Sequence, residues 1–143
     1  MKSATIYERK NRLYFHACSQ TTAGIWMLSA PVLTTEKGNI REGGRMVKDC
    51  LAASRQGIAH PSSFPNLFKP MLDLAGVKSY GTFVNSSKSV GITTDDGVSA
   101  ILTPYRNDGP KHGYTPLAEM PAIPLASDEE LGAAILAALE NAE

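Results

Sequence analysis

The feature that most constrains the fold is a pair of strand-like runs joined by a tight turn. Residues 89–94 (SVGITT) and 98–105 (VSAILTPY) alternate with the two-residue period of half-buried strands. Asp96-Gly97 lies between them and is among the strongest short signals for a β-hairpin, because both residues tolerate the positive φ angles of a two-residue loop. The chain is therefore expected to contain an antiparallel hairpin here.

The length of this loop predicts which residues face each other. With Asp96 and Gly97 as the loop, the expected pairs across the hairpin are Thr94 with Ser99, Ile92 with Ile101 and Val90 with Thr103. One face of the hairpin would then carry an Ile–Ile pair, which stabilises an antiparallel sheet.

Three further strands are expected in the first third of the chain. Residues 4–7 and 12–17 flank the polar segment 8–11, so they predict a hairpin with a four-residue loop. Residues 24–33 are the most apolar run and predict a buried strand. Pro31 has no N–H to donate, so this strand is expected to end there or to lie at a sheet edge.

The middle of the chain carries two helical patterns. Apolar residues recur at helical spacing over residues 44–55, and Gly57 is the expected terminator. After a proline-rich loop at residues 60–70, a short helix is expected up to Gly76. Residues 80–84 (YGTFV) then read as another strand.

The last helix has the clearest local signals. Ser127 is a good N-cap and Glu130 stands three residues later, which is the spacing of a capping box. The apolar positions that share one helix face are Leu131, Ile135, Ala138 and Leu139. That face is expected to dock on the sheet, while residues 106–126 form a long irregular connection before the helix.

The order of these elements predicts the fold class. Strands are mostly joined by hairpins, and helices are grouped rather than alternating with strands, which is typical of an α+β fold. We expect residues 1–143 to form a single domain with a mainly antiparallel sheet of about five or six strands. About three helices are expected to pack on that sheet.

The composition is that of a soluble globular protein, with 43% hydrophobic and 20% charged residues. The N-terminal residues lack the apolar run of a signal peptide, and no segment approaches the length of a membrane span. A cytoplasmic location and no membrane partner are therefore expected. Cys18 and Cys50 are expected to be free thiols in that reducing compartment.

Motifs for catalysis or cofactors are not found. The segment 38–45 (GNIREGGR) has phosphate-loop glycine spacing but lacks the following Lys and Ser/Thr. His16, His60 and His112 are far apart, so neither a metal site nor a cofactor is expected. A binding protein is thus favoured over an enzyme. An enzyme with a catalytic site around His112 in the long connection is a weaker alternative.

The formal charge of zero hides an uneven distribution. Residues 1–90 carry 12 Lys/Arg and 5 Asp/Glu, whereas residues 91–143 carry 2 and 9. The halves, at +7 and −7, either complement each other within the fold or leave a one-signed surface that attracts a charged partner.

The C-terminal segment 124–142 (PLASDEELGAAILAALENA) resembles the end of immunity proteins from bacterial contact-dependent growth inhibition (CDI) systems. The matching residues are Ser127, Asp128, Glu129, Glu130, Leu131 and Gly132, followed by Ala138 and Leu139; GIWMLS at residues 24–29 is compatible with the same family. The resemblance implies a non-enzymatic protein that binds the toxin domain of its own system in the cytoplasm and blocks its active site.

Many toxins of such systems are nucleases, so an acidic surface on the inhibitor would mimic nucleic acid. On charge, with two tyrosines as aromatic anchors, the predicted partner-binding residues are Asp95, Asp96, Tyr105, Asp108, Tyr114, Asp128, Glu129 and Glu130. Direct binding of nucleic acid is not expected under this hypothesis, and the oligomeric state stays open.

The alternative hypothesis is a small protein that binds single-stranded nucleic acid. The N-terminal half carries basic residues with Tyr7, Tyr14 and Phe15 between them, and exposed aromatic side chains on basic strands can stack with bases. A sequence pI of about 6.8 speaks against dominant phosphate binding.

Overall fold

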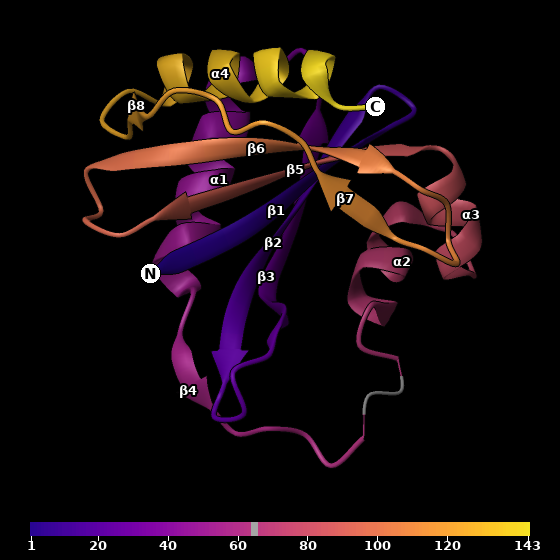
Figure 1. The fold of residues 1–143 in the computed structure, drawn as a ribbon. Coiled ribbons are helices and arrows are strands. Elements are labelled where there is room, and N and C mark those ends of the chain that lie inside the picture. Colours follow the sequence, from indigo (N-terminus) through magenta and orange to yellow (C-terminus); the bar gives the residue numbers. More distant parts are fainter. Residues whose placement is uncertain (64–65) are drawn as a thin grey trace.

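The computed structural model describes residues 1–63 and 66–143, and this part of the chain forms eight strands and four helices (Figure 1). The strands are β1 (Lys2–Arg9), β2 (Arg12–Thr21), β3 (Trp26–Glu36), β4 (Gln56–Ile58), β5 (Ser87–Thr94), β6 (Ser99–Asn107), β7 (Tyr114–Pro116) and β8 (Ile123–Pro124). The helices are α1 (Ile40–Ala53), α2 (Lys69–Ala75), α3 (Tyr80–Asn85) and α4 (Asp128–Asn141).

All eight strands belong to one sheet, in the order β3-β2-β1-β5-β6-β7. β4 adds to β2 and β8 adds to β6 outside this path. Every pair is antiparallel except β2 with β4. The predicted α+β class is confirmed, with more strands and one more helix than expected.

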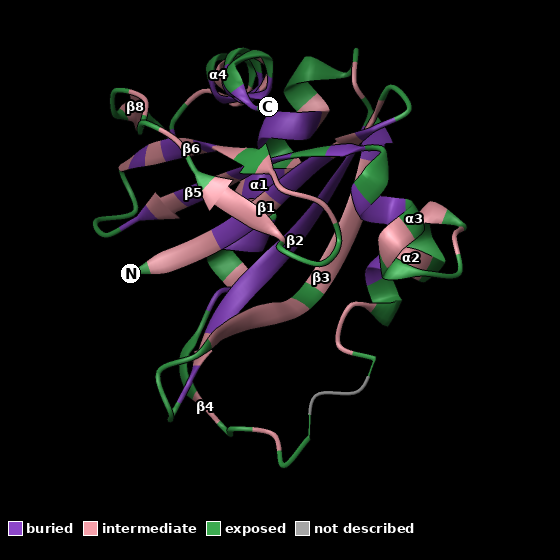
Figure 2. Cartoon of the chain, turned by 45° about the vertical axis from the view of Figure 1, so that its right-hand side comes forward, coloured by how far each residue is buried: buried purple, intermediate pink, exposed green. Residues whose placement is uncertain are grey.

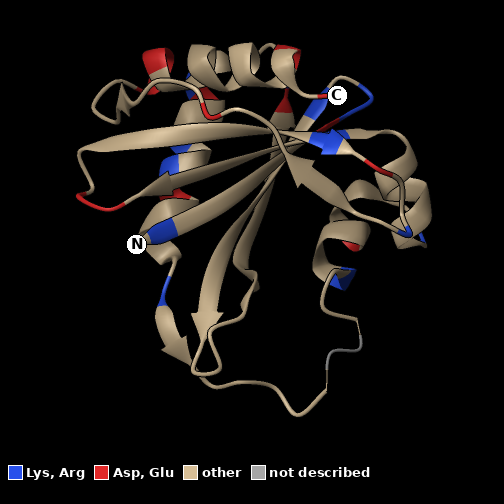
Figure 3. Ribbon diagram, viewed as in Figure 1, with Lys and Arg blue, Asp and Glu red and all other residues tan. Residues whose placement is uncertain are grey.

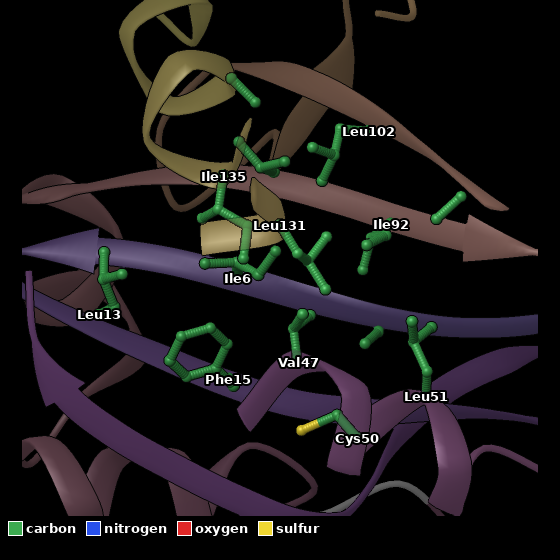
Figure 4. Packing of buried hydrophobic residues seen from close by; sticks show 14 of the residues in the cluster. Ile6, Leu13, Phe15, Val47, Cys50, Leu51, Ile92, Leu102, Leu131 and Ile135 are labelled. Atoms are coloured by element: carbon green, nitrogen blue, oxygen red, sulfur yellow. The ribbon is translucent and has the colours of Figure 1, made fainter. Parts of the chain in front are cut away.

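Helices α1 and α4 pack on one face of the sheet and on each other, and this is where the main core lies (Figure 4). Ile6 and Phe15 project from the central strands toward Val47 of α1 and Ile135 of α4, and all four are fully buried. Burial of each such side chain stabilises the fold by about 1.5–3 kcal/mol. Figure 2 shows the consequence, since β2 is buried along most of its length and β1 along half of it.

The opposite face of the sheet carries a smaller cluster beneath α2 and α3. Tyr7 and Tyr14 pack there against Met71 of α2 and Phe83 of α3. The expected strand at residues 80–84 is wrong, because this segment forms α3. Ser79 caps α3 by accepting a hydrogen bond from the Thr82 backbone N–H, and burial of Phe83 outweighs the strand propensity of the short run.

The first hairpin has a two-residue turn instead of the expected four-residue loop. Lys10 and Asn11 both have positive φ angles, of 49° and 67°, as required in the turn that best matches the twist of a hairpin. Arg9 consequently faces Arg12 directly across the hairpin. The polar residues 8 and 9 therefore belong to β1, and the loop consists of residues 10 and 11 alone.

The second hairpin forms as expected, but its predicted register is wrong by one residue. Ile92 faces Leu102, and Thr93 faces Ile101. The turn is longer than two residues because the Asp96 carboxylate accepts hydrogen bonds from the Val98 and Ser99 backbone N–H groups. A one-residue shift exchanges the faces of a strand; Leu102, rather than Ile101, therefore enters the main core.

Two other boundaries differ from expectation. α1 starts at Ile40, four residues early, and it ends before Ser54 rather than at Gly57, which lies in β4 with a φ of 74°. β3 continues through Pro31 and lies at the sheet edge, which was one of the two expected outcomes.

The end of α2 and the start of α4 agree with the expectations, whereas the long connection before α4 contains strands that were not expected. α2 ends at Gly76 in the left-handed conformation, as predicted. Ser127 caps α4 by accepting from the Glu130 N–H at 3.1 Å, and the predicted apolar face of α4 is buried. The connection 106–126 contains the short strands β7 and β8. Of the expected loop 60–70, residues 64–65 lie outside the described residues.

Candidate protein-binding surface

The sheet face opposite α1 and α4 is hollowed where α2 and α3 do not cover it. The hollow encloses about 500 Å³. Its lining comes from the strands β1, β2, β3, β5 and β6 and from the segments around α2 and α3: Met1, Ser3, Thr5, Tyr7, His16, Cys18, Trp26, Met27, Leu28, Leu67, Phe68, Tyr80, Thr93 and Tyr105. This size is within the range of protein ligand pockets, about 300–1,000 Å³.

A buried histidine lies at the base of the hollow. His16 is 5% exposed, and its Nδ1 donates a hydrogen bond to the Ala17 carbonyl at 2.9 Å. Its Nε2 accepts from the Tyr7 hydroxyl at 3.3 Å. Burial lowers the pKa of His16 to about 4, so the ring is neutral at pH 7.

Cys18 lies beside this histidine, with its Sγ 3.7 Å from the His16 Nδ1 and 3.3 Å from the Thr5 hydroxyl. Burial raises the pKa of the Cys18 thiol. A nucleophilic cysteine needs the opposite shift, toward the thiolate, from a positively charged neighbour. Cys18 and Cys50 are both buried, free cysteines, as predicted.

Tyr105 forms one wall of the hollow by lying across Gly91 of β5. A Cβ atom at position 91 would come within 2.8 Å of the Tyr105 hydroxyl oxygen, so the absence of a side chain lets the tyrosine lie against the sheet. Burial raises the pKa of Tyr105, and the phenol stays neutral at pH 7. Within the described residues its hydroxyl makes no hydrogen bond.

Aromatic rings build the opposite wall. Phe68 stacks edge-on with Tyr80 at 5.1 Å between ring centroids and lies 5.7 Å from Tyr7. The charged group among the lining residues is the Met1 ammonium, which lies 4.0 Å from an Asp95 carboxylate oxygen. The chemistry of the hollow therefore suits an uncharged, apolar or aromatic segment with a few hydrogen-bonding groups.

The predicted acidic residues do not come together in one place (Figure 3). Asp95 and Asp96 lie at the tip of the β5–β6 hairpin. Asp96 is engaged by the turn itself, whereas the Asp95 side chain is 89% exposed. The contact between Asp95 and Met1 places this tip beside one end of the hollow.

Asp108 and Tyr114 lie at the other end of β6. The Asp108 carboxylate accepts from Arg106 Nε at 2.7 Å and from the Thr115 hydroxyl, and both contacts lower its pKa. Tyr114 shares a hydrogen bond of 2.6 Å with the Ser87 hydroxyl and packs in the α2–α3 cluster. Both side chains thus have partners within the chain.

The acids at the start of α4 face α1. Asp128 pairs with Lys48 at 2.8 Å, and Glu129 pairs with Arg41. Glu130 provides the N3 position of the helix and is exposed. The two charge halves therefore complement each other here, as the first interpretation of the charge distribution expects.

Of the eight predicted residues, Tyr105 lines the hollow and Asp95 borders it. The other lining residues were missed because Phe68, Tyr80 and Trp26 lie on segments that no local pattern brings together. Alternation along residues 3–7 was the available signal, since Ser3, Thr5 and Tyr7 share the face opposite the core.

The side chains named for nucleic-acid stacking are buried. Tyr7, Tyr14 and Phe15 are 9%, 4% and 0% exposed. Their rings contact the protein interior on both faces of the sheet, so they offer no stacking surface for bases. His112 lies in a backbone turn with Gly109, and catalysis there stays an untested hypothesis.

Two absences hold for the described residues. No group of three or more His, Cys, Asp or Glu side chains is arranged to hold a metal ion across residues 1–63 and 66–143. Within the same ranges, none of the helices has the length and apolar character needed to span a bilayer.

Comparison with known proteins places the fold. No model of a known family and no curated protein sequence matches the chain. Among solved structures, it is similar to a protein of unknown function from Neisseria meningitidis, with a TM-score of 0.77, 16% identity, and coverage of 99% of this chain and 95% of that one.

It is also similar to a chain of a CdiA-CT/CdiI toxin and immunity complex from Yersinia pseudotuberculosis. The TM-score is 0.78 at 16% identity, and the match covers 99% of this chain and 97% of that chain. Both similarities extend over nearly the whole length, so the entire arrangement of sheet and helices is shared.

Proposed function

We propose that this protein is an immunity protein that binds and neutralises the toxin domain of its own CDI system. The observation that carries the proposal is the full-length similarity in fold to a chain of a toxin and immunity complex. The resemblance of residues 124–142 to the end of such immunity proteins supports it independently of the fold. Such a protein acts in the cytoplasm, requires no cofactor, and is not an enzyme.

The hollow is the surface we assign to the toxin. Tyr105, Trp26 and Phe68 supply the aromatic area that dominates the energetics of protein interfaces, and concave placement lets a partner segment exclude water from them. Asp95 stands at the rim with an exposed carboxylate. It can pair with a basic residue of the toxin next to the buried contact.

The finer form of the proposal is that the toxin is a nuclease whose active site is blocked. It is supported by acidic groups that remain exposed, Asp95 and Glu130, because a phosphate-binding toxin surface is basic. Asp108, Asp128 and Glu129 contribute less to this attraction, since each already pairs with a basic side chain.

Co-expression with the product of the adjacent upstream gene tests the function. The expected result is that the two proteins co-purify and that the immunity protein restores growth of cells that express the toxin. A nuclease assay on the released toxin, with and without this protein, then tests the finer form. Lack of a toxin-like reading frame beside the gene, together with no retained partner, would overturn the proposal.

Two matched variants test the surface. Thr93→Arg adds a guanidinium to the uncharged lining and should weaken toxin binding by at least about tenfold, because a charge must be desolvated on binding. Thr22→Arg makes the same change at an exposed position outside the hollow and should bind like the wild type. Equal affinities of the two variants would place the toxin on another surface.

A further inference from the structure

Arg9 is a buried charge with few partners. It is 6% exposed and is the one Lys, Arg, Asp or Glu among the buried residues of the described chain. Its Nε donates to the Ser86 hydroxyl at 2.9 Å. No carboxylate of the described residues lies within the 4.0 Å of an ion pair, in contrast to Arg41, Arg45 and Arg106. Buried charges in proteins are normally paired.

The unused donors of Arg9 reach the surface. A guanidinium has five N–H donors, and the structure uses the one on Nε. Among the described residues, no fully buried side-chain nitrogen or oxygen lacks a hydrogen bond. The two terminal nitrogens of Arg9 are therefore accessible at their tips, while the rest of the side chain is held inside the protein.

The neighbours of Arg9 make this end of the sheet positive. Arg12 lies directly across the hairpin, so both side chains project on the same face. Arg12 Nε contacts the Thr34 hydroxyl at 3.4 Å, and Lys10 occupies the turn (blue turn beside the C-terminus, Figure 3). Glu36, opposite Arg12 on β3, makes no ion pair with it. Glu8 and Lys37, beside the same turn, pair with each other at 3.0 Å. Among the charged residues 8–12 and 36–37, the three cations Arg9, Lys10 and Arg12 and the single carboxylate of Glu36 therefore lack an ion pair.

A purely structural role accounts for part of this arrangement. Ser86 is the C-cap of α3, and a cation near a helix C-terminus is favoured. However, α3 has six residues, and one hydrogen bond to a hydroxyl leaves the fork of the guanidinium unused. Like charges directly opposite in a strand pair are also destabilising. A bound anion would relieve both features.

We propose that Arg9, with Arg12 and Lys10, forms a binding site for a tetrahedral dianion, such as phosphate or the phosphoryl group of a phosphate monoester. The terminal nitrogens of Arg9 would donate to two oxygens of the anion, in the planar geometry that favours arginine over lysine. Arg12 and Lys10 contribute the second and third positive charges, which favour a dianion over a carboxylate. The site is separate from the hollow and does not depend on the proposed function.

The test is a titration of the intact protein with inorganic phosphate at constant ionic strength, in which two-dimensional NMR spectra are recorded at each phosphate concentration. The signals of the Arg9 Nε–H and of the Lys10 and Ser86 backbone amides should shift and saturate. Sulfate should act like phosphate, whereas acetate and chloride should give weak, unsaturated shifts. Titration with adenosine monophosphate and with adenosine distinguishes a phosphoryl group on an ester from recognition of the nucleoside.

Variants test whether the guanidinium group of Arg9 is responsible for these phosphate-dependent shifts. Arg9→Lys keeps the charge and should weaken phosphate binding by about tenfold, because the paired donors are lost. Arg12→Gln should weaken it by about threefold. Lys111→Met, which removes an exposed cation elsewhere, should leave it unchanged. Arg9→Met removes charge and fork together, and should abolish the saturable shifts.

Three results would overturn the site. Phosphate shifts no larger than those of chloride would exclude a specific anion site, and equal effects of acetate and phosphate would exclude the preference for a dianion. Unchanged phosphate binding in Arg9→Lys would show that Arg9 only caps α3. If Arg9→Met does not fold, the Lys variant and Arg12→Gln still decide the question.

Discussion

His16 is a side chain whose protonation the fold suppresses. The ring is enclosed, and its Nε2 accepts a hydrogen bond from the Tyr7 hydroxyl, which a protonated ring could not do. Burial lowers the pKa of His16 from 6.5 to about 4. The folded protein thus stays unprotonated at His16 in a pH range where the unfolded chain binds a proton.

This difference predicts how stability changes with pH. The unfolded histidine takes up its proton as the pH falls through 6.5, whereas the folded one does so only near 4. The neutral, buried His16 therefore makes its full contribution to stability above pH 6.5. Between pH 6.5 and 4 this contribution is lost, which lowers the free energy of unfolding by about 3 kcal/mol. Urea unfolding at pH 7 and pH 4.5 should show the loss.

Two histidine variants isolate the effect from the titration of carboxylates. His16→Gln should reduce the difference between the two pH values, since its side chain does not titrate. His112→Gln changes an exposed histidine and should keep the wild-type difference. An equal loss of stability in wild type and His16→Gln would contradict the assignment.

At the scale of elements, the contact between α1 and α4 depends on two glycines. A Cβ atom at Gly44 would collide with the Asp128 carbonyl, and one at Gly132 would collide with the Ile40 carbonyl. Backbone thus approaches backbone where the helices meet. Lys48 and Asp128 pair across the same contact.

The close approach predicts an unusual sign for a glycine substitution. Gly132→Ala would normally stabilise a helix by about 1 kcal/mol. Here the added methyl group forces α4 away from α1, and we expect a net loss of about 1–3 kcal/mol, as in overpacked cores. Chemical denaturation measures this change.

Gly38→Ala is the matched control for this substitution. A Cβ atom at Gly38 meets no atom within 4 Å, so its effect on the free energy of unfolding should be within about 0.5 kcal/mol. A stabilised Gly132→Ala variant would mean that the two helices can separate without cost.

Elements with redundant local signals could be predicted from the sequence. α4 has a cap, first-turn acids and an apolar face that agree, and α2 ends at a glycine suited to a left-handed residue. α3 could not be predicted, because burial of Phe83 decides it and that contact is tertiary. The predicted register of β5 and β6 is wrong because the Asp96 carboxylate stabilises a longer turn than the Asp96-Gly97 pair implies.

At the scale of the whole molecule, the opposite charges of the two halves partly neutralise each other through ion pairs within the chain. Arg41 with Glu129 and Lys48 with Asp128 join the basic N-terminal part to the acidic C-terminal part. The hollow is uncharged apart from its Met1 end. Its aromatic wall could not be predicted, because Trp26, Phe68 and Tyr105 meet only through the overall topology.

The two candidate binding modes predict different responses to salt. If the toxin binds through the hollow, its affinity should fall by less than about threefold between 50 and 300 mM NaCl, because burial of apolar area is little screened. If the acidic residues dominate, the fall should exceed about tenfold. Calorimetric titration of the purified toxin domain at the two salt concentrations distinguishes these modes.

The position of β1 in the sheet has a consequence for the time course of folding. β1 is synthesised first, but its partner β5 follows about 80 residues later, which corresponds to roughly 4–16 s of synthesis at cellular rates. Until then, one edge of the central strand lacks its ladder. Joining β1 to β5 closes the longest loop in the sheet and is therefore expected to limit the folding rate.

Stopped-flow refolding can test this order of events. Ile92→Val, on β5, should slow refolding, whereas Ile135→Val, on α4, should mainly speed unfolding. The opposite pattern would mean that α4 docks before the sheet is joined. The strand that is made first would then still be completed last, and a nascent chain would keep its bare strand edge until after α4 had been synthesised.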